Sequence, residues 1–347
     1  MIHNKPIDNI KHLFVRSFDR IPAIYRRIQT ILMQKLFLAI TTAAFIISCS
    51  TVPPEPLRVN ASTWIGCEPF FLARELGYYD NKPIELIETT FVQDQHRAFL
   101  NDEFDMLCTS LDATLELIDN KADTRVFLVL DVSHGADALV VQAEIENIAD
   151  LKGKTIGIPP FPLARLLLTR ALETADLSIE DVELVDLEIV DQEAPFQSKE
   201  IDAAVTFEPA RSSLIASGAK LLFDSSQVPG EIVDVLIGSQ SLGSTHAQQI
   251  KILLDGWFKA LDEIEKNPKE SIELMAKREG ISPDQFEQAL QGLQLIGLKD
   301  NQAIFDRTDT DFIEGMRRLS VFLEKTEIIQ NEIDPITIFE EKPLNEF

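Results

Sequence analysis

The sequence predicts an α/β protein with two lobes and a ligand cleft between them. From residue 57 onward, strand patterns alternate with helix patterns, which is typical of largely parallel sheets. The alternation falls into two blocks, and the second block begins at "DLKGKTIGI". The chain has 347 residues, which is more than one small core usually holds.

The first block opens with a strand predicted at residues 57–63, followed by a helix with Pro69 in its first turn. Proline suits that position because the N–H that it lacks has no partner inside the helix. Further strands are predicted at 84–90, 105–110, 125–133 and 137–142, and helices follow the first two of these.

The second block repeats the pattern. It contains the strand "KTIGI", the apolar helix "PLARLLLTRALETA", the strands "VELVDLEI", "DAAVTF" and "AKLLFD", and a return strand at 232–238. From Thr245 the apolar residues follow a helical period, and Trp257 lies on that stripe, so we expect it in the core. We expect these C-terminal helices to pack on the first lobe.

The order of the elements predicts a boundary between the lobes. With chain crossings near residues 140 and 231, lobe 1 comprises 57–140 and 231–347, and lobe 2 comprises 141–230. In open α/β sheets a ligand lies beyond the carboxyl ends of the strands, so the cleft is the expected binding site.

The N-terminal 49 residues have the pattern of a leader with a lipoprotein signal. The apolar run from Leu36 to Cys49 has the length of a signal-peptide core, and "IISC" resembles a bacterial lipobox, in which the cysteine is lipidated. Met33 is an alternative start. Residues 50–56, with their prolines, are expected to form a tether.

Charge narrows the class of partner. Residues 1–35 contain seven lysines and arginines and two acidic residues, whereas the whole chain has a formal net charge of −25. A body this acidic repels phosphates, so we expect no nucleic-acid partner. It tolerates cationic ligands.

An aromatic residue precedes a Glu-Pro pair at one strand-to-helix junction in each block. Trp64 and Glu68 lie at the first junction, and Phe207 and Glu208 at the second. An aromatic face beside a carboxylate suits a cation, through cation–π attraction and ion pairing. Glutamate is a poor capping residue, so we expect these two pairs to form opposite sides of the cleft.

Other polar residues also fall at strand ends. Ser110 and Asp112 have an ordinary explanation as the cap and first turn of a helix, and for Asp131 a structural role is also preferred. His134 and Asp137 border a turn beside the expected cleft. The chain has no motif for nucleophilic catalysis or nucleotide binding and no metal-ligand spacing, so we expect no cofactor, metal or catalytic residues.

Several motifs in order resemble the substrate-binding proteins of nitrate/sulfonate/taurine-type ABC importers, a superfamily that includes binders of thiamine pyrimidine precursors. They are "TWIGCEPFFLARELGYYD", "VFLVLDVSHGADALVV", "DLKGKTIGI", "IDAAVTFEPARSSLIASGAKLLFDSS" and "PGEIVDVLIG". The resemblance implies a type II periplasmic binding-protein fold, a small-molecule ligand and delivery to a membrane permease. The cleft-lining residues that it implies are Trp64, Cys67, Glu68, Ser110, Asp112, His134, Asp137, Phe207 and Glu208.

Two departures from the family bear on the ligand. Many relatives have an aromatic residue where Cys67 stands, and many have Ser or Thr where this chain has "PPFPL" after the "GI" strand. Those hydroxyls help to hold anionic groups in sulfonate binders. Their loss, together with the acidic residues, favours a cationic or amine-bearing compound, such as an amidine, a guanidinium-like compound or an aminopyrimidine.

Other functions stay open at this point. The ligand is alternatively a sulfonate, taurine or nitrate-type anion, or a thiamine pyrimidine precursor. The protein is alternatively a lipoprotein that senses its ligand, or an enzyme similar to the pyrimidine-precursor synthases, although the cysteine-rich iron motif of those enzymes is absent. We expect a monomer in the periplasm or on the outer face of the cytoplasmic membrane, anchored through Cys49. Cys67 and Cys108 are expected as separate thiols rather than a disulfide.

Overall fold

The computed structural model describes residues 33, 35, 55–62, 64–89, 92–120, 122–208 and 210–347. The predicted lipidation at Cys49, the leader and most of the tether lie outside the described residues. Glu55–Phe347 form one compact unit. In the described part of the chain, no helix has both the length and the apolar character that crossing a membrane requires.

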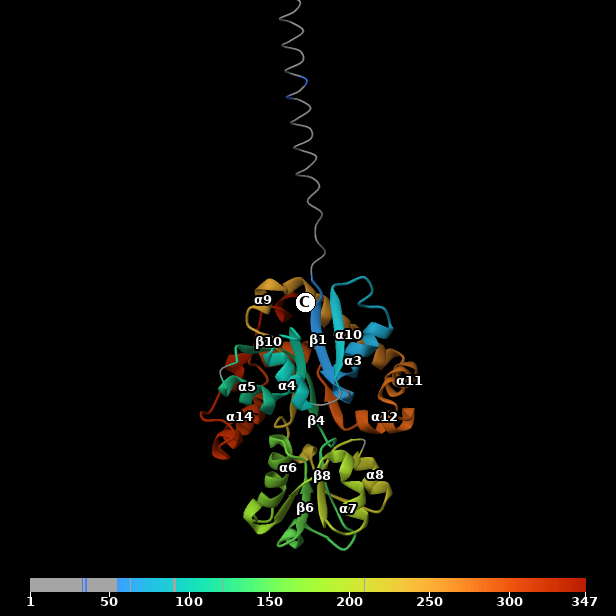
Figure 1. Cartoon of the computed structure of the whole chain (residues 1–347), viewed down its shortest axis with the longest axis vertical. Coiled ribbons are helices and arrows are strands. Elements are labelled where there is room, and N and C mark those ends of the chain that lie inside the picture. Colours follow the sequence, from blue (N-terminus) through green and yellow to red (C-terminus); the bar gives the residue numbers. More distant parts are fainter. Residues whose placement is uncertain are drawn as a thin grey trace, which may run out of the picture. The chain divides into compact units, whose positions relative to one another are not determined.

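The unit contains two sheets (Figure 1). The first sheet is mixed, because β10 runs antiparallel to both of its neighbours while β1 is parallel to β2 and β3. Its strands, in spatial order, are β11 (Leu293–Leu295), β4 (Thr124–Ser133), β10 (Val233–Ser239), β3 (Met106–Ser110), β1 (Leu57–Ser62) and β2 (Ile84–Thr89).

The second sheet has five strands with β8 between the parallel β6 and the antiparallel β5. Its strands, in spatial order, are β7 (Glu183–Asp186), β6 (Thr155–Ile158), β8 (Ala203–Thr206), β5 (Ala138–Val141) and β9 (Lys220–Asp224). Strand β5 corrects the expected boundary. It was assigned mainly to lobe 1, but it pairs with β8 and β9, so the first crossing lies between Ser133 and Ala138.

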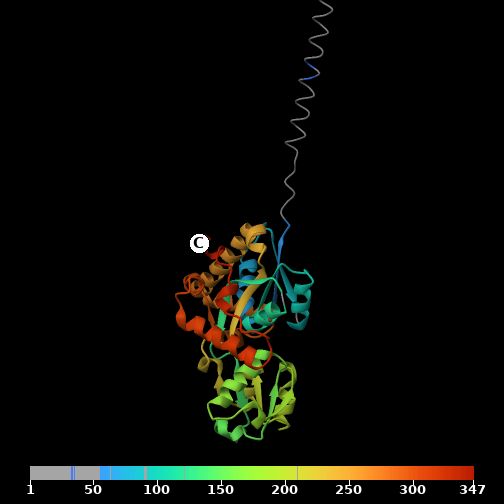
Figure 2. The same ribbon diagram turned by 90° about the vertical axis from the view of Figure 1, so that its left-hand side faces the viewer.

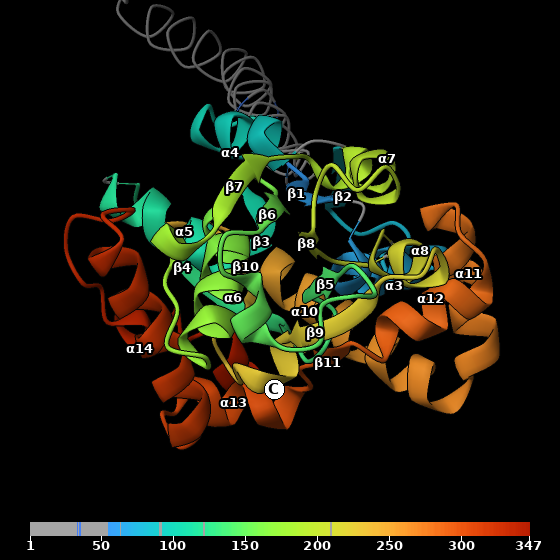
Figure 3. The ribbon, with the colours of Figure 1, turned by 90° about the horizontal axis from the view of Figure 1, so that it is seen from below.

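Helices surround both sheets, which confirms the α/β prediction. The second sheet has α6 (Pro162–Glu173) on one face and α7 (Glu193–Gln197) and α8 (Ala210–Ala216) on the other (Figure 3). The helices of the first sheet are α3 (Glu68–Glu75), α4 (Val92–Leu100), α5 (Leu111–Asp119), α9 (Leu242–Thr245), α10 (Ala247–Lys266), α11 (Pro268–Glu279), α12 (Pro283–Leu290), α13 (Leu298–Phe305) and α14 (Thr310–Lys325).

Short 3-10 helices join several of these elements. They are η1 (Ile65–Cys67), η2 (Ile148–Leu151), η3 (Ile179–Asp181), η4 (Ile189–Asp191), η5 (Ser225–Gln227), η6 (Pro335–Ile338) and η7 (Leu344–Glu346). Of these, η1 matters most for the site, because it connects β1 to α3 at the end of the first sheet.

The C-terminal helices pack on the first sheet, as predicted (Figure 2). Helix α10 lies on α3, and α14 lies on α5. Trp257 of α10 is fully buried, and its ring centroid lies 4.6 Å from that of Phe70 in α3. The apolar stripe that predicted the helix is therefore also what attaches it to the lobe.

The chain crosses between the sheets twice, and side chains fasten the two crossings together. The hydroxyls of Ser133 and Ser225 are 2.7 Å apart, and Ser225 also accepts a hydrogen bond from the backbone N–H of Gly135. The buried carboxylate of Glu231 binds Arg170 of α6 at 2.8 Å and Arg318 of α14 at 2.9 Å. Glu231 thus links a helix of each lobe at the return crossing.

The return crossing touches α14 through two glycines. A Cβ on Gly315 would lie 2.7 Å from backbone atoms of Gly230, which itself has a φ of +73°. Glycine is the residue that fits both positions, because one needs a left-handed backbone and the other a close backbone approach.

Gly315→Ala is expected to destabilise the protein, although alanine normally stabilises a helix interior by about 1 kcal/mol over glycine. The added methyl group must displace the crossing, and overpacking of this kind costs about 1–3 kcal/mol. The measurement is the free energy of unfolding in urea. Gly297→Ala is the matched control, because a Cβ there meets nothing within 4 Å. Equal or greater stability of Gly315→Ala would contradict the close approach.

Candidate functional site

Three polar residues lie in one row across the carboxyl edge of the first sheet. Because β10 is antiparallel to β3 and β4, its beginning lies beside their ends. Asp234 of β10 pairs with Ser110 of β3 on one side and with Asp131 of β4 on the other. Residues directly opposite each other on neighbouring strands point to the same face of a sheet. The two aspartates therefore face each other.

Asp131 is fully buried, and neither of its carboxylate oxygens has a hydrogen-bond partner among the described residues. The backbone of η1 covers it. A Cβ on Gly66 would overlap Oδ2 of Asp131, so a residue with a side chain does not fit there. Burial and the negative charge of Asp234 raise the pKa of Asp131 well above its usual range.

Asp234 is less enclosed and reaches the aromatic side of the site. Its Oδ2 accepts a hydrogen bond of 2.7 Å from Nε1 of Trp64. Burial, followed by the charge of Asp137, raises the pKa of Asp234 to about 7, although the bond from Trp64 acts in the opposite direction. Trp64 thus orients the carboxylate that the sheet presents.

Two further aspartates complete a group that we call the aspartate cluster: Asp112, Asp131, Asp137 and Asp234. Burial raises the pKa of Asp137 to about 6, against a hydrogen bond from Ser133, and the charge of Asp112 raises it further. Burial also raises the pKa of Asp112, which lies in the first turn of α5. Within the described residues, no recorded ion pair joins any of the four to a lysine, arginine or histidine.

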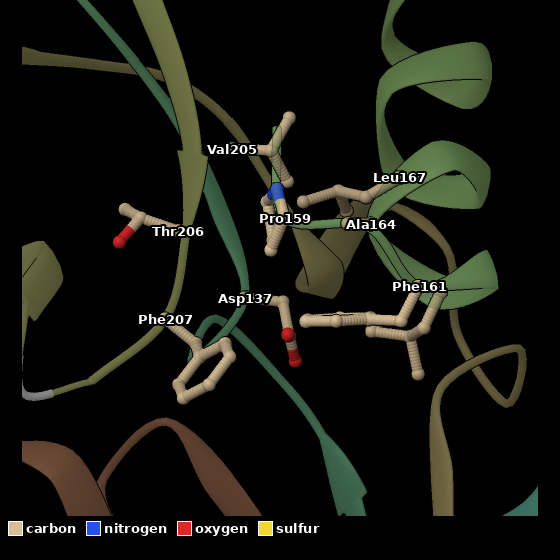
Figure 4. A pocket seen from close by; sticks show the side chains of 9 residues that line it. Asp137, Pro159, Phe161, Ala164, Leu167, Val205, Thr206 and Phe207 are labelled. Atoms are coloured by element: carbon tan, nitrogen blue, oxygen red, sulfur yellow. The ribbon is translucent and has the colours of Figure 1, made fainter. Parts of the chain in front are cut away.

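Aromatic side chains lie beside the cluster. The ring of Trp64 meets that of Phe207, which follows β8, edge to face with centroids 5.5 Å apart. The ring of Phe161 lies 6.3 Å from Phe207. Asp137 lies between these two phenylalanines at a small hollow (Figure 4). The site therefore combines aromatic surfaces from both sheets with carboxylates that lack counter-ions.

The structure corrects the role expected for Glu68. Its carboxylate is fully buried and accepts hydrogen bonds of 2.7 and 2.9 Å from Nε of Arg278 in α11, and a further one from Nη2 of that arginine. The guanidinium lies 3.6 Å from the centroid of the Phe71 ring. Glu68 is therefore committed to a partner inside lobe 1 and is not a free carboxylate of the cleft.

Glu208 is also paired, which removes the second expected carboxylate. It is 2% exposed and accepts hydrogen bonds from Nη1 of Arg211 at 2.8 Å and from the backbone N–H of Ser212 at 3.2 Å. Both partners lie in the helix that follows it. The repeated Glu-Pro motif therefore marks two ion pairs, one with a distant arginine and one within a single helical turn, whereas the aromatic residues that precede it do meet.

The other predicted residues divide between core and surface. Cys67 and Cys108 are buried as free thiols, and Cys67 belongs to the hydrophobic core rather than to the cleft. A hydrogen bond with Cys108, and burial, raise the pKa of the Cys67 thiol well above its usual range. His134 is exposed at the crossing, and no interaction between described residues links its ring to the aspartate cluster.

Sequence reasoning missed Asp234 and set Asp131 aside. The signal was present as a lone acid within an apolar strand, "IVDVLIG", and another in "VFLVLDVS". Charged residues are almost never fully buried without a partner. In the described part of the chain, no group of three or more His, Cys, Asp or Glu side chains has the geometry to hold a metal ion.

A family model described as NMT1/THI5 like matches residues 64–271, which is more than half of the chain. The chain belongs to the NMT1/THI5-like family. This confirms the resemblance to the substrate-binding superfamily of ABC importers. The matched range contains the aspartate cluster, Trp64 and Phe207. A comparison with curated proteins finds no match.

Solved structures share the fold of this NMT1/THI5-like chain at low sequence identity. The periplasmic aliphatic sulphonate-binding protein SsuA from Escherichia coli has a TM-score of 0.71 and 18% identity, covering 83% of this chain and 92% of SsuA. The alkanesulfonate-binding protein SsuA from Xanthomonas axonopodis pv. citri, bound to MOPS, has a TM-score of 0.68 and 17% identity. The match covers 84% of this chain and 99% of that protein. The desulfurization enzyme DszB has a TM-score of 0.64 and 19% identity, and the match covers 84% of this chain and 98% of DszB.

Proposed function

We propose that this protein is an extracytoplasmic solute-binding lipoprotein that captures a small cationic or amine-bearing nitrogenous compound and delivers it to an ABC importer. The family and the fold support the binding role. The signal pattern that ends at Cys49 supports export and a lipid anchor, in the periplasm or on the outer face of the cytoplasmic membrane. The protein acts as a monomer beside its permease.

The observation that carries the ligand class is the aspartate cluster beside the Trp64 and Phe207 rings. Like charges that share a buried site raise the free energy of the ionised state, and a bound cation lowers it. Aromatic faces attract the same cation and fit a flat one. An amidinium, a guanidinium or a protonated aminopyrimidine supplies a planar charge with N–H donors for the carboxylates.

The same cluster disfavours the sulfonates that the SsuA proteins are named for. A sulfonate in this site would lie beside Asp234 and Asp137, which have no lysine, arginine or histidine partner among the described residues. The hydroxyl-bearing residues expected after the "GI" strand are replaced by Pro159, Pro160 and Phe161. At this low identity the likeness to SsuA supports the fold alone. The chemistry of the site is what supports the proposed cationic ligand.

A thermal-shift panel tests the ligand class. At pH 8 we expect benzamidinium and guanidinium compounds, which stay charged at that pH, to raise the melting temperature, and taurine, ethanesulfonate and nitrate to leave it unchanged. A ligand at one hundred times its dissociation constant adds about 2.7 kcal/mol to the free energy of unfolding. A panel in which the sulfonates alone stabilise the protein would overturn the cationic ligand.

A second role is chemical conversion of the ligand, because DszB shows that this fold also supports an enzyme. The experiment is to incubate the purified protein with each stabilising compound and to recover that compound for mass spectrometry. A binding protein returns it unchanged.

A further inference from the structure

The two aspartates that face each other at the edge of the first sheet differ in what can reach them. Asp131 is 0% exposed and lies beneath Gly66 of η1. Asp234 is partly exposed and binds the indole N–H of Trp64, so it is on the side of the aromatic residues. A ligand that approaches from the side of the Trp64 ring therefore reaches Asp234, while Asp131 stays behind it.

The surroundings of the pair hold acids and thiols. The pKa of Asp131 is raised by Asp234 of β10, Asp137 of the crossing and Cys108 of β3. Cys67 of η1 lies near both Asp131 and Asp234. Asp112 of α5 and Asp137 act on Asp234. On β11, the residues aligned with Asp131 and its neighbour are Leu295 and Gln294, which are uncharged. Among the described residues, no cation neutralises the pair.

We propose that Asp131 and Asp234 share one proton in the unliganded protein, and that a cationic ligand bound at Asp234 displaces it. This inference rests on the proposed function. Two buried carboxylates that face each other cannot both ionise without a counter-ion, and a proton between them gives Asp131 the hydrogen bond that it otherwise lacks. The ligand brings the positive charge, the pair loses its proton to solvent, and the charge of the site is conserved.

The sign of the pH dependence follows from this exchange. Proton and cation compete, so a cation binds more tightly as the pH rises through the range where the pair releases its proton. With Asp234 titrating at about 7, affinity for a permanent cation should rise about tenfold between pH 6 and pH 8. An anion would show the opposite trend, because it prefers the protonated pair.

The unliganded protein loses stability as the pH rises. The folded pair binds its proton more strongly than the unfolded chain does, so its stabilising contribution is full at low pH and is lost as the pH rises through the folded pKa. The melting temperature of the free protein should therefore fall as the pH rises from about 4, the pKa of an aspartate in the unfolded chain, to about 7, and Asp131→Asn should flatten this fall.

Infrared difference spectroscopy tests the shared proton without any ligand. At pH 7 the wild-type protein should show a carboxylic acid C=O band that is absent from both Asp131→Asn and Asp234→Asn. Asp137→Asn is the control, and it should keep the band, because Asp137 neighbours the pair without sharing its proton. If Asp131→Asn keeps the wild-type band, the shared proton is disproved whatever the protein binds.

Calorimetry with benzamidinium tests the displacement. Titrations at pH 7 in phosphate and in Tris should give enthalpies that differ by the release of about half a proton per bound cation, because a pair that titrates near pH 7 is about half protonated there. Asp131→Asn should still bind benzamidinium but should release a smaller fraction of a proton. Its affinity should be the same at pH 6 and at pH 8. Equal enthalpies in the two buffers for the wild-type protein would overturn the displacement.

The two proposals fail in different ways. If no cationic compound binds at pH 8, the proposed function fails and with it the displacement, while the infrared band still decides the shared proton. If benzamidinium binds with no pH dependence and no band is found, the cation-binding function stands and the proton inference is wrong.

Discussion

Asp234→Asn should reduce the affinity for a cationic ligand more than any other single substitution in the site. It removes the carboxylate that faces the aromatic residues and keeps the oxygen that accepts the bond from Trp64. A hydrogen bond to a charged group contributes about 1.5–3 kcal/mol. That loss corresponds to roughly 10- to 150-fold weaker binding of benzamidinium, measured by isothermal titration at pH 8.

The matched control for this variant is Glu183→Gln at the beginning of β7, which removes one negative charge from an exposed position at the opposite edge of the second sheet. It should bind benzamidinium as the wild-type protein does, since exposed charges far from the site are largely screened by salt. Trp64→Phe distinguishes the contribution of the aromatic ring from that of the indole N–H, because it keeps an aromatic face and removes the hydrogen bond to Asp234. If Asp234→Asn binds benzamidinium as tightly as the wild-type protein does, the Asp234 carboxylate is not part of the binding site.

Arg278→Met should cause the largest loss of stability. Removing one partner of a buried ion pair costs about 3–5 kcal/mol, because an uncompensated charge stays behind. Here the residue left behind is Glu68, which is 0% exposed. Burial raises its pKa, and the Arg278 guanidinium opposes that rise. Without the arginine, Glu68 takes up a proton more readily, so the loss should be greater at pH 9 than at pH 6.

Urea unfolding monitored by circular dichroism measures this loss. The double variant Glu68→Gln/Arg278→Met is the control and should recover most of it, because it leaves no unpaired charge. The folded fraction of Arg278→Met should bind benzamidinium normally, since no interaction between described residues joins this ion pair to the aspartate cluster. If Arg278→Met loses binding but keeps its stability, Glu68 acts in the cleft and the ion-pair role assigned to it is wrong.

Much of the fold was predictable because its determinants are local. The apolar stripe that contains Trp257 predicted α10, and alternating strand and helix patterns predicted two sheets. The prediction placed β5 in the wrong lobe, since a short, fully buried strand carries no periodic signal of the sheet to which it pairs. Sheet membership depends on hydrogen bonds to β8 and β9, which follow it in the chain.

The site was less predictable than the fold. The aromatic residues Trp64 and Phe207 were expected on opposite sides of a cleft, and the structure brings their rings together. The carboxylates beside them in the sequence, Glu68 and Glu208, are each paired with an arginine. Arg211 is close in sequence and could have been noticed, whereas Arg278 is 210 residues from Glu68.

The sequence by itself determined the class of the chain, its alternating elements, its acidity and the aromatic character of the site. Each of these is a property of single residues or of short periodic segments. Only the tertiary structure decided which acids keep a counter-ion. Register places Asp131 opposite Asp234, and packing brings Arg278 to Glu68. The energy of a buried carboxylate depends on what lies within a few ångströms of it, and those neighbours come from distant parts of the chain.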